Sequence, residues 1–132
     1  EDRLLDGLTA TANVRLPHGR LRGRALGEFL EREREALRAV GLPVDARPVR
    51  ELSGGQRRRV AVLRCVLAPA DVLLLDEPLK GMDDGTVGRV MSYVAPLLEG
   101  RTVVWVTHDP REAALLPDPV AWRVEDGLVR PA

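Results

Sequence analysis

The hydrophobic period of the chain changes near Asp71, and this change constrains the fold more than any other feature. Upstream of it, apolar residues recur at helical spacing, whereas residues 72–75 form one short apolar run that ends at acidic residues and Pro78. A run of this length predicts a strand buried on both faces of a parallel sheet. A second apolar run at 102–106 predicts the next strand.

Helical spacing predicts most of the other elements. Gly41 and Pro43 supply the stop signal for the first long amphipathic stretch, and Thr9 or Thr11 could cap a shorter helix before it. Helices are predicted at residues 24–40, 54–68 and 87–98, with a short one inside 1–17. The second half of the chain thus alternates strand and helix, which favours an α/β fold, while the first third is helical.

Two local signals complete the predicted elements. Asp109-Pro110-Arg111-Glu112 has the form of a capping box and predicts a short helix that runs to Leu116. Asp126-Gly127 lies between two short apolar segments, at 120–124 and 128–130, and predicts a β-hairpin.

Composition excludes several classes of protein. Cys65 is the only cysteine, so an internal disulfide and a cysteine metal cluster are both excluded, and a buried structural thiol is expected. The formal net charge is zero, which argues against general electrostatic binding to nucleic acid. No apolar run approaches the roughly 18 residues that a membrane span requires. Lys80 is the only lysine.

The segment Leu52-Ser53-Gly54-Gly55-Gln56 lies where a loop is predicted to become a helix. A serine cap and two glycines at a helix start let ligand oxygens approach the backbone N–H groups, which suits a phosphate. An ordinary serine-capped helix start has the same appearance, and for this segment taken alone it is the favoured interpretation.

Asp76 and Glu77 follow the first predicted strand, and His108 follows the second. The carboxyl ends of parallel strands are where α/β sheets bind ligands. One carboxylate there could hold Mg²⁺ while its neighbour accepts a proton from water, and the histidine could bind a terminal phosphate. Each feature alone is more often loop or cap chemistry.

In order along the chain stand L-S-G-G-Q, V-L-L-L-D-E-P, G-M-D-D and V-V-W-V-T-H-D, and this series resembles the ATP-binding subunits of ABC transporters. The resemblance covers essentially the whole chain but not the whole of that family's domain. It implies an α/β fold, a partial P-loop NTPase-type parallel sheet with a helical subdomain at the amino-terminal end. Residues 1–51 would be the helical segment, and 52–132 the carboxyl-terminal part of the ATPase core.

The resemblance also implies roles for single residues. The segment 52–56 matches the signature motif, which contacts the γ-phosphate of ATP bound to the opposite subunit. Asp76 matches the aspartate that holds Mg²⁺, and Glu77 the catalytic glutamate that polarises the hydrolytic water. Asp83 matches the aspartate that links the two sites of the dimer, and His108 the histidine that senses the γ-phosphate.

One part of the family's machinery is not in these residues. No G-x-x-x-x-G-K-[ST] loop occurs, and Lys80, between Leu79 and Gly81, cannot serve as its lysine. The resemblance places that loop, and the glutamine before residues 1–5, upstream. We therefore expect the chain alone to bind ATP weakly and to hydrolyse it negligibly. Missing strands would also leave apolar surface uncovered and favour self-association.

The resemblance implies that the full-length protein is an ATP hydrolase coupled to transport across a membrane, with import indicated by residues 1–5. Its cofactors would be ATP and Mg²⁺, and its partners a second ATP-binding subunit in a head-to-tail dimer and membrane-spanning subunits. It would lie in the cytoplasm, on the inner face of the plasma membrane. Two alternatives stay open. One is a non-catalytic binding module that docks on a complete ATPase, and the other is a non-transport ABC ATPase that acts on nucleic acid or ribosomes through the basic residues 57–59.

Overall fold

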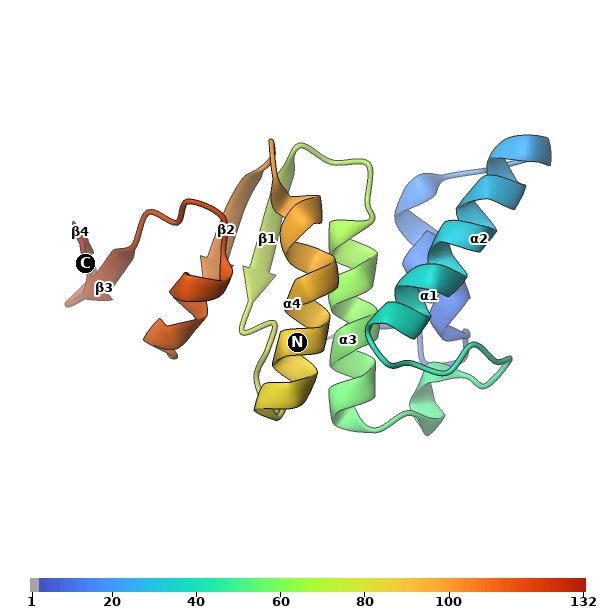
Figure 1. Cartoon of the computed structure of the whole chain (residues 1–132), viewed down its shortest axis with the longest axis horizontal. Coiled ribbons are helices and arrows are strands. Elements are labelled where there is room, and N and C mark those ends of the chain that lie inside the picture. Colours follow the sequence, from blue (N-terminus) through green and yellow to red (C-terminus); the bar gives the residue numbers. More distant parts are fainter. Residues whose placement is uncertain (1–2) are drawn as a thin grey trace.

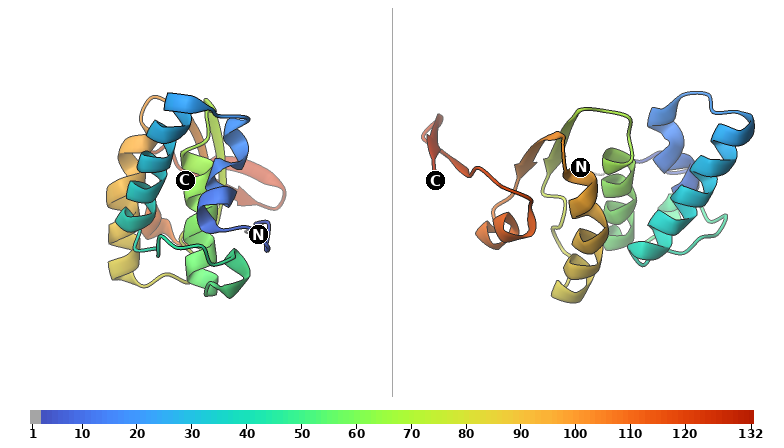
Figure 2. Two further views of the ribbon diagram at one scale, coloured as in Figure 1. Left: turned by 90° about the vertical axis from the view of Figure 1, so that its right-hand side faces the viewer. Right: turned by 45° about the horizontal axis from the view of Figure 1, so that its top comes forward.

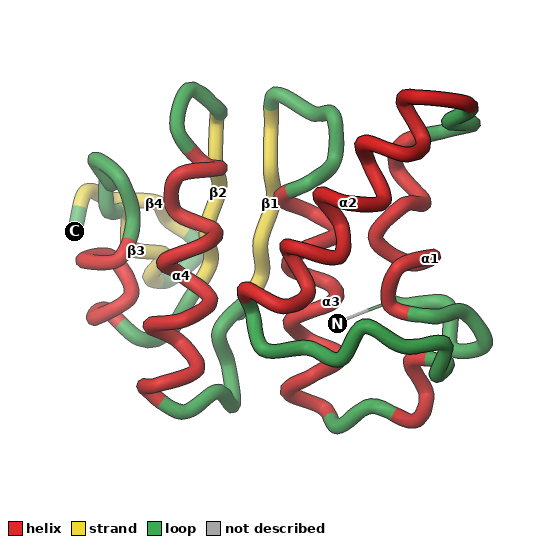
Figure 3. The backbone as a smooth tube through the Cα atoms, turned by 45° about the vertical axis from the view of Figure 1, so that its right-hand side comes forward, coloured by secondary structure: helices red, strands yellow, loops and turns green. Residues whose placement is uncertain are grey.

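The structure, a computed structural model, describes residues 3–132, so the start of the segment 1–5 lies outside the described residues. Helices make up most of the first half of the chain and strands appear only in the second, as Figure 3 shows. The helices are α1 (Ala10–Arg15), α2 (Gly23–Ala39), α3 (Gly54–Val66) and α4 (Asp84–Leu98). The strands are β1 (Val72–Asp76), β2 (Thr102–Val106), β3 (Trp122–Glu125) and β4 (Leu128–Pro131). Short 3₁₀ helices lie at Leu16–His18, Val49–Glu51 and Pro110–Leu115.

Strands β1 and β2 pair in parallel, with Val72 opposite Thr102 and Asp76 opposite Val106. The predicted parallel α/β arrangement is therefore confirmed. Helix α3 runs against the direction of β1, so its amino end and the carboxyl ends of both strands lie at the same end of the molecule (Figure 1). The predicted site residues at the two strand ends and at the start of α3 therefore lie at the same end of the molecule.

Helices α3 and α4 form the core with one face of this sheet. Leu73 and Leu75 point into that core, where they join the predicted apolar face of α3, whose residues Val60, Leu63 and Leu67 are all buried. Thr9 caps α1, since its hydroxyl accepts a hydrogen bond from the amide of Ala12, as one of the two predicted caps requires. The apolar pattern of the helices therefore predicted which side of each helix is buried.

The prediction that the strand after Asp71 is buried on both faces is wrong for this chain. Val72 and Leu74 of β1 are 56% and 71% exposed, and Val104 and Val106 of β2 are 48% and 52% exposed. Helices cover only the opposite face of the sheet, so the apolar run is half solvated. These four side chains form a continuous apolar surface, called the open sheet face below.

The carboxyl-terminal hairpin stands away from the other elements at one end of the molecule (Figure 2). Strands β3 and β4 pair antiparallel on either side of Asp126 and Gly127. Both turn residues have positive φ, 51° and 74°, as the tight turn of a two-residue hairpin requires. This prediction is confirmed.

Candidate functional site

The predicted residues Glu77 and His108 meet at the carboxyl ends of β1 and β2. The parallel register continues one residue beyond β1, because the Glu77 amide donates to the Val106 carbonyl at 2.8 Å. His108 follows β2 by two residues, in the turn before the 3₁₀ helix Pro110–Leu115. The two strands therefore bring together side chains that are 31 positions apart in sequence.

The Glu77 carboxylate is hydrogen-bonded at one oxygen and unpaired at the other. His108 Nδ1 lies 2.7 Å from Glu77 Oε1, and this hydrogen bond is the largest cause of the lowered pKa of Glu77. Among residues 3–132, Glu77 Oε2 is buried and has no hydrogen-bond partner. The site thus holds an ionised carboxylate whose second oxygen is buried and lacks a hydrogen-bond partner in the described residues.

The backbone of Glu77 is also unusual. Its φ is +48°, in the left-handed region that side-chain-bearing residues rarely adopt. Its carbonyl accepts hydrogen bonds from the Lys80 amide at 3.2 Å and from Arg58 Nη1 at 3.3 Å. Strained backbone of this kind persists only where surrounding contacts hold it. No pattern in the sequence predicted this conformation.

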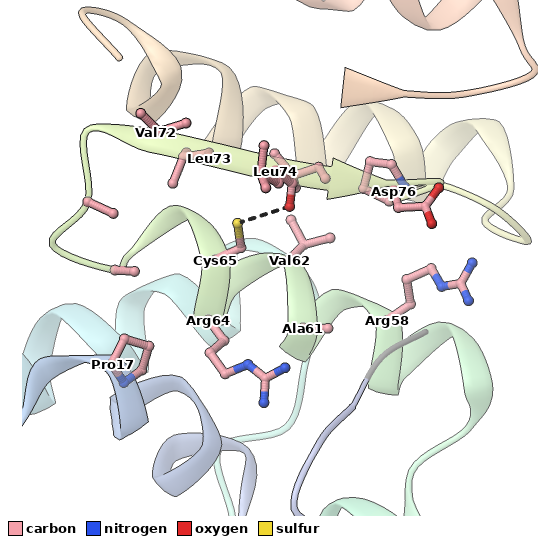
Figure 4. A pocket seen from close by; sticks show the side chains of 14 residues that line it. Pro17, Arg58, Ala61, Val62, Arg64, Cys65, Val72, Leu73, Leu74 and Asp76 are labelled. Carbon is pink, nitrogen blue, oxygen red and sulfur yellow. Dashed lines mark hydrogen bonds between the residues drawn. The ribbon is translucent and has the colours of Figure 1, made fainter. Parts of the chain in front are cut away.

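Asp76 lies beside this pair with an exposed side chain, at the last position of β1. It lines a cavity of about 430 Å³ between α3 and the outer edge of β1. Figure 4 shows Asp76 and Arg58 at the same end of that cavity. Cys65 also lines it and is half-buried rather than fully buried as predicted, with burial raising the pKa of its thiol.

The segment Leu52-Ser53-Gly54-Gly55-Gln56 begins α3 with a complete capping box. The Gln56 amide donates to Ser53 Oγ at 3.2 Å, and the Ser53 amide donates to Gln56 Oε1 at 2.9 Å. Leu52 is 8% exposed and anchors the segment in the core. The segment is therefore a serine-capped helix start, as the favoured interpretation of the sequence predicted.

Nothing in the described residues requires glycine at positions 54 and 55. Neither has a positive φ, and a Cβ added to Gly54 or Gly55 would meet nothing within 4 Å among the described residues. Their N–H groups belong to the first turn, which has no intrahelical partners, at the positive end of the helix dipole. The geometry leaves room for an external anion to approach this backbone closely.

Asp83 is held in a local role at the start of α4. Its carboxylate accepts hydrogen bonds from the Thr86 amide at 2.9 Å and the Thr86 hydroxyl at 2.7 Å, and these bonds lower its pKa. No hydrogen bond or ion pair joins Asp83 to Glu77 or His108 in the part of the chain that the structure describes. Asp83, like the segment 52–56, is thus a predicted site residue that the structure does not bond to this pair.

The predicted short helix begins after its Asp109 cap and runs to Leu115, but the capping box is incomplete because its glutamate bonds elsewhere. Asp109 accepts from the Arg111 amide at 3.0 Å, but Glu112 turns inward and accepts from Trp105 Nε1 at 2.7 Å. Glu112 is only 8% exposed, because the indole N–H offers it a buried partner. This bond ties β2 to the 3₁₀ helix Pro110–Leu115 and so fixes the turn that carries His108. Sequence reasoning missed it, although a tryptophan N–H in a buried strand does demand an acceptor.

A family model described as "ABC transporter" matches residues 1–80, more than half of the chain. The chain belongs to the ABC transporter family. The aliphatic sulfonates import ATP-binding protein SsuB 1 of Rhodococcus jostii is 41% identical over 98% of the chain and 51% of its own length. The methionine import ATP-binding protein MetN of Carboxydothermus hydrogenoformans is 36% identical over 96% of the chain and 40% of its own length.

A solved structure confirms that the fold is that of an ABC transporter cassette. The dimeric bacterial cassette MJ0796 matches 86% of the chain with a TM-score of 0.72 and 32% identity. The match covers 52% of that cassette, so the chain spans about half the length of its relatives or less. In residues 3–132, no helix is both long enough and apolar enough to cross a membrane. The resemblance stated from the four sequence segments is thus confirmed, and the roles of single residues remain proposals.

Proposed function

We propose that this chain supplies the signature and hydrolytic residues of the ATP-binding subunit of an ABC transporter. The observation that carries the proposal is the Glu77 carboxylate, with Oε1 bonded to His108 and Oε2 buried without a partner in residues 3–132. A carboxylate that is ionised, oriented and unpaired at one oxygen can act on a water molecule once the nucleotide and water complete the site. In this proposal residues 1–51 form a helical subdomain and 52–132 the carboxyl-terminal part of the ATPase core.

The proposed reaction is hydrolysis of the terminal phosphoryl group of ATP. Glu77 Oε2 orients the attacking water and takes its proton as the water oxygen bonds to the γ-phosphorus and the bond to the β,γ-bridging oxygen breaks. His108 holds Oε1, so the carboxylate cannot rotate away from the water. The other ring nitrogen of His108, on a side chain that is 71% exposed, can contact the γ-phosphate.

Asp76 fits a magnesium site of the kind that nucleotides complete. Within residues 3–132 no cluster of three or more ligating side chains could hold a metal ion by itself. Mg²⁺ on a nucleotide needs only one or two protein carboxylates, because phosphates and waters provide the other oxygens. Asp76 would be that carboxylate, and the ion would neutralise charge on the phosphates.

The start of α3 would serve a second ATP molecule, bound to another subunit. The open space at Gly54 and Gly55 and the free N–H groups of the first turn suit a phosphate that arrives from outside the chain. Such an arrangement calls for a head-to-tail dimer, and the similar cassette MJ0796 is described as dimeric. Asp83, near the amino end of α4, would then contact the partner subunit.

We further propose that the full-length protein works with membrane-spanning subunits on the cytoplasmic face of the plasma membrane, and that it serves import. Two relatives that match nearly the whole chain are named for import of aliphatic sulfonates and of methionine. The segment 1–51, rich in helix, would be the part that contacts those subunits. The chain alone lacks a glycine-rich lysine loop and should neither bind ATP tightly nor turn it over.

A chimera tests the proposal. The chain would replace the matching half of the Rhodococcus relative, so that the relative's remaining residues complete the cassette. We expect this chimera to hydrolyse Mg²⁺-ATP, and Glu77→Gln to lower kcat by about 10²–10⁴-fold while nucleotide still binds. The matched control is Glu99→Gln, an exposed carboxylate after α4. Equal turnover in the Glu77→Gln and control chimeras would contradict the proposal.

A further inference from the structure

Arg58 crosses from helix α3 to the turn that follows β1. Its Nη1 donates to the carbonyl of Glu77 at 3.3 Å and approaches the carbonyl of Lys80 at 3.5 Å. The side chain is half-buried and lines the same end of the cavity as Asp76 (Figure 4). One guanidinium thus spans both ends of the turn 77–80.

This turn needs external support because of the backbone of Glu77. A residue with φ of +48° relaxes toward ordinary conformations unless its peptide groups are held. Its amide is held by the Val106 carbonyl at 2.8 Å, and its carbonyl by the Lys80 amide and Arg58. Arg58 is the one side chain that bonds to this carbonyl within residues 3–132.

We propose that Arg58 is a positioning residue that fixes the peptide of Glu77 so that Oε1 meets His108 and Oε2 stays unpaired. Arg58 lies on the same helix as the signature segment, two positions after Gln56. Through this contact the orientation of Glu77 depends on the placement of α3, whose amino end is the proposed phosphate site of the partner's nucleotide. The catalytic meaning of the contact rests on the proposed function, whereas the contact itself does not.

If Arg58 only stabilises the fold, its replacement should leave the conformation of Glu77 unchanged as long as the chain folds. The groups that shift the pKa of Glu77 are His108, through its hydrogen bond and charge, and Lys80, through its charge. Because loss of the Arg58 charge by itself also raises the pKa of a nearby carboxyl, the titration is read together with the coupling between the amide and α protons of Glu77, which reports φ and does not depend on charge. A rise in pKa with a change in that coupling reports that the peptide of Glu77 has moved and that its carboxylate has left His108.

The test is a ¹³C NMR titration of the Glu77 carboxyl in the 132-residue chain. Arg58→Met keeps the apolar stem and removes the donors, Arg58→Lys keeps a donor, and Arg38→Met on the exposed side of α2 is the matched control. We expect Arg58→Met to raise the pKa of Glu77 toward its ordinary value of 4.5. Arg58→Lys should restore much of the lowering, and the control should leave it unchanged.

Two results would overturn the proposal. One is a Glu77 titration that Arg58→Met leaves as in the parent chain. The other is a rise that Arg58→Lys shows in full, since a donor would then not matter. If Arg58→Met does not fold, Arg58→Lys is compared with the control instead. A pKa of Glu77 that returns fully to its ordinary value in Arg58→Lys contradicts a tether through a donor.

The chimera adds a kinetic readout. Arg58→Met should lower kcat by up to about 100-fold, as small misplacements of reacting groups do, with little change in KM for ATP. An unchanged kcat would also count against the proposal. If Glu77→Gln has no effect on turnover, the proposed function fails, and the titration still decides whether Arg58 positions Glu77.

Discussion

Glu77 Oε1 and His108 Nδ1 lie 2.7 Å apart, although the two residues are 31 positions apart in the sequence. The pairing of β1 with β2 sets this distance, because the Glu77 amide extends the parallel ladder onto the Val106 carbonyl. The acidic and the basic partner are therefore held in contact by the pairing of the two strands. Other contacts, in loops and at helix ends, stabilise the fold that holds this pair.

Gly41 is expected to tolerate no side chain. Its φ is +69°, and a Cβ there would lie 2.6 Å from Arg89 Nη1 and 3.3 Å from Arg59 Nη1. Arg59 Nη1 donates to the carbonyls of Val40 and Gly41 at 2.8 and 3.3 Å, which holds that guanidinium beside the turn. The Arg89 guanidinium is the end of a flexible side chain and can shift, so the positive φ of Gly41 supplies most of the cost. Gly41→Ala should lower the free energy of unfolding by roughly 1–3 kcal/mol in urea denaturation.

Gly27→Ala is the matched control for that substitution. Gly27 lies in α2 with ordinary φ and open space around it, so alanine should stabilise the helix by up to about 1 kcal/mol. If the Gly41→Ala chain is as stable as the Gly27→Ala chain, the left-handed turn at the end of α2 is not as described.

Arg101 is predicted to be the main polar support of the helix ends. Its guanidinium donates to the carbonyls of Val66, Ala68 and Ala70 at 2.6, 2.5 and 2.7 Å, where α3 ends and the chain turns toward β1. Arg101→Met would leave these carbonyls without a charged donor and should cost about 3 kcal/mol of unfolding free energy. Arg101→Lys should cost less. Arg123→Met, on the exposed hairpin, should be neutral, and a neutral Arg101→Met would show that water replaces the guanidinium at no cost.

Glu33 should make stability depend on pH near neutrality. The side chain is fully buried between α1 and α2, and neither carboxylate oxygen has a hydrogen-bond partner among residues 3–132. The nearest cation is Arg15, whose Nη2 lies 3.8 Å from Oε2. Desolvation raises the pKa of Glu33 from 4.5 to about 7, against the weaker lowering by Arg15 and Arg34.

The sign of the effect follows from that shift. Because the folded chain holds the Glu33 proton more tightly than the unfolded chain, its contribution is fully present below pH 4.5 and is lost as pH rises through about 7. The loss is about 3 kcal/mol, and Glu33→Gln should remove this part of the pH dependence. Glu31→Gln, an exposed member of the same helix, should keep it. Equal pH profiles for the parent chain and Glu33→Gln would contradict the raised pKa.

The open sheet face should cause the chain to self-associate. Val72, Leu74, Val104 and Val106 are about half exposed or more, and β1 and β2 pair only with each other in the described residues. Light scattering should show a mass that rises with concentration, and Leu74→Glu should shift the chain toward monomer. Val129→Glu, on the separate hairpin, is the control. A monomer at high concentration would contradict this prediction.

The local patterns of the sequence predicted the elements well because each depends on neighbouring residues. Periodic apolar positions predicted α2 and α3, and Asp126-Gly127 predicted the hairpin turn. The strand ends that carry Glu77 and His108 followed from the same reasoning, since parallel strands must end at one edge of the sheet.

The features that the sequence did not predict all depend on contacts with residues distant in the chain. Leu74 is exposed because no element of residues 3–132 covers that side of β1, and an apolar run cannot reveal this. Glu33 is buried at a position where a charged residue in a helix predicts solvent. The left-handed backbone of Glu77 depends on contacts with Val106, Lys80 and Arg58, which no local pattern encodes.

His108 holds Glu77 as an ionised, oriented acceptor, and the pKa of the Glu77 carboxyl reports whether it does so. The pKa of the Glu77 carboxyl would be followed by ¹³C NMR in the 132-residue chain and in His108→Ala, with His18→Ala as the control. We expect a pKa below 4.5 in the parent and control chains and a rise toward 4.5 in His108→Ala. The same pKa in all three chains would contradict it.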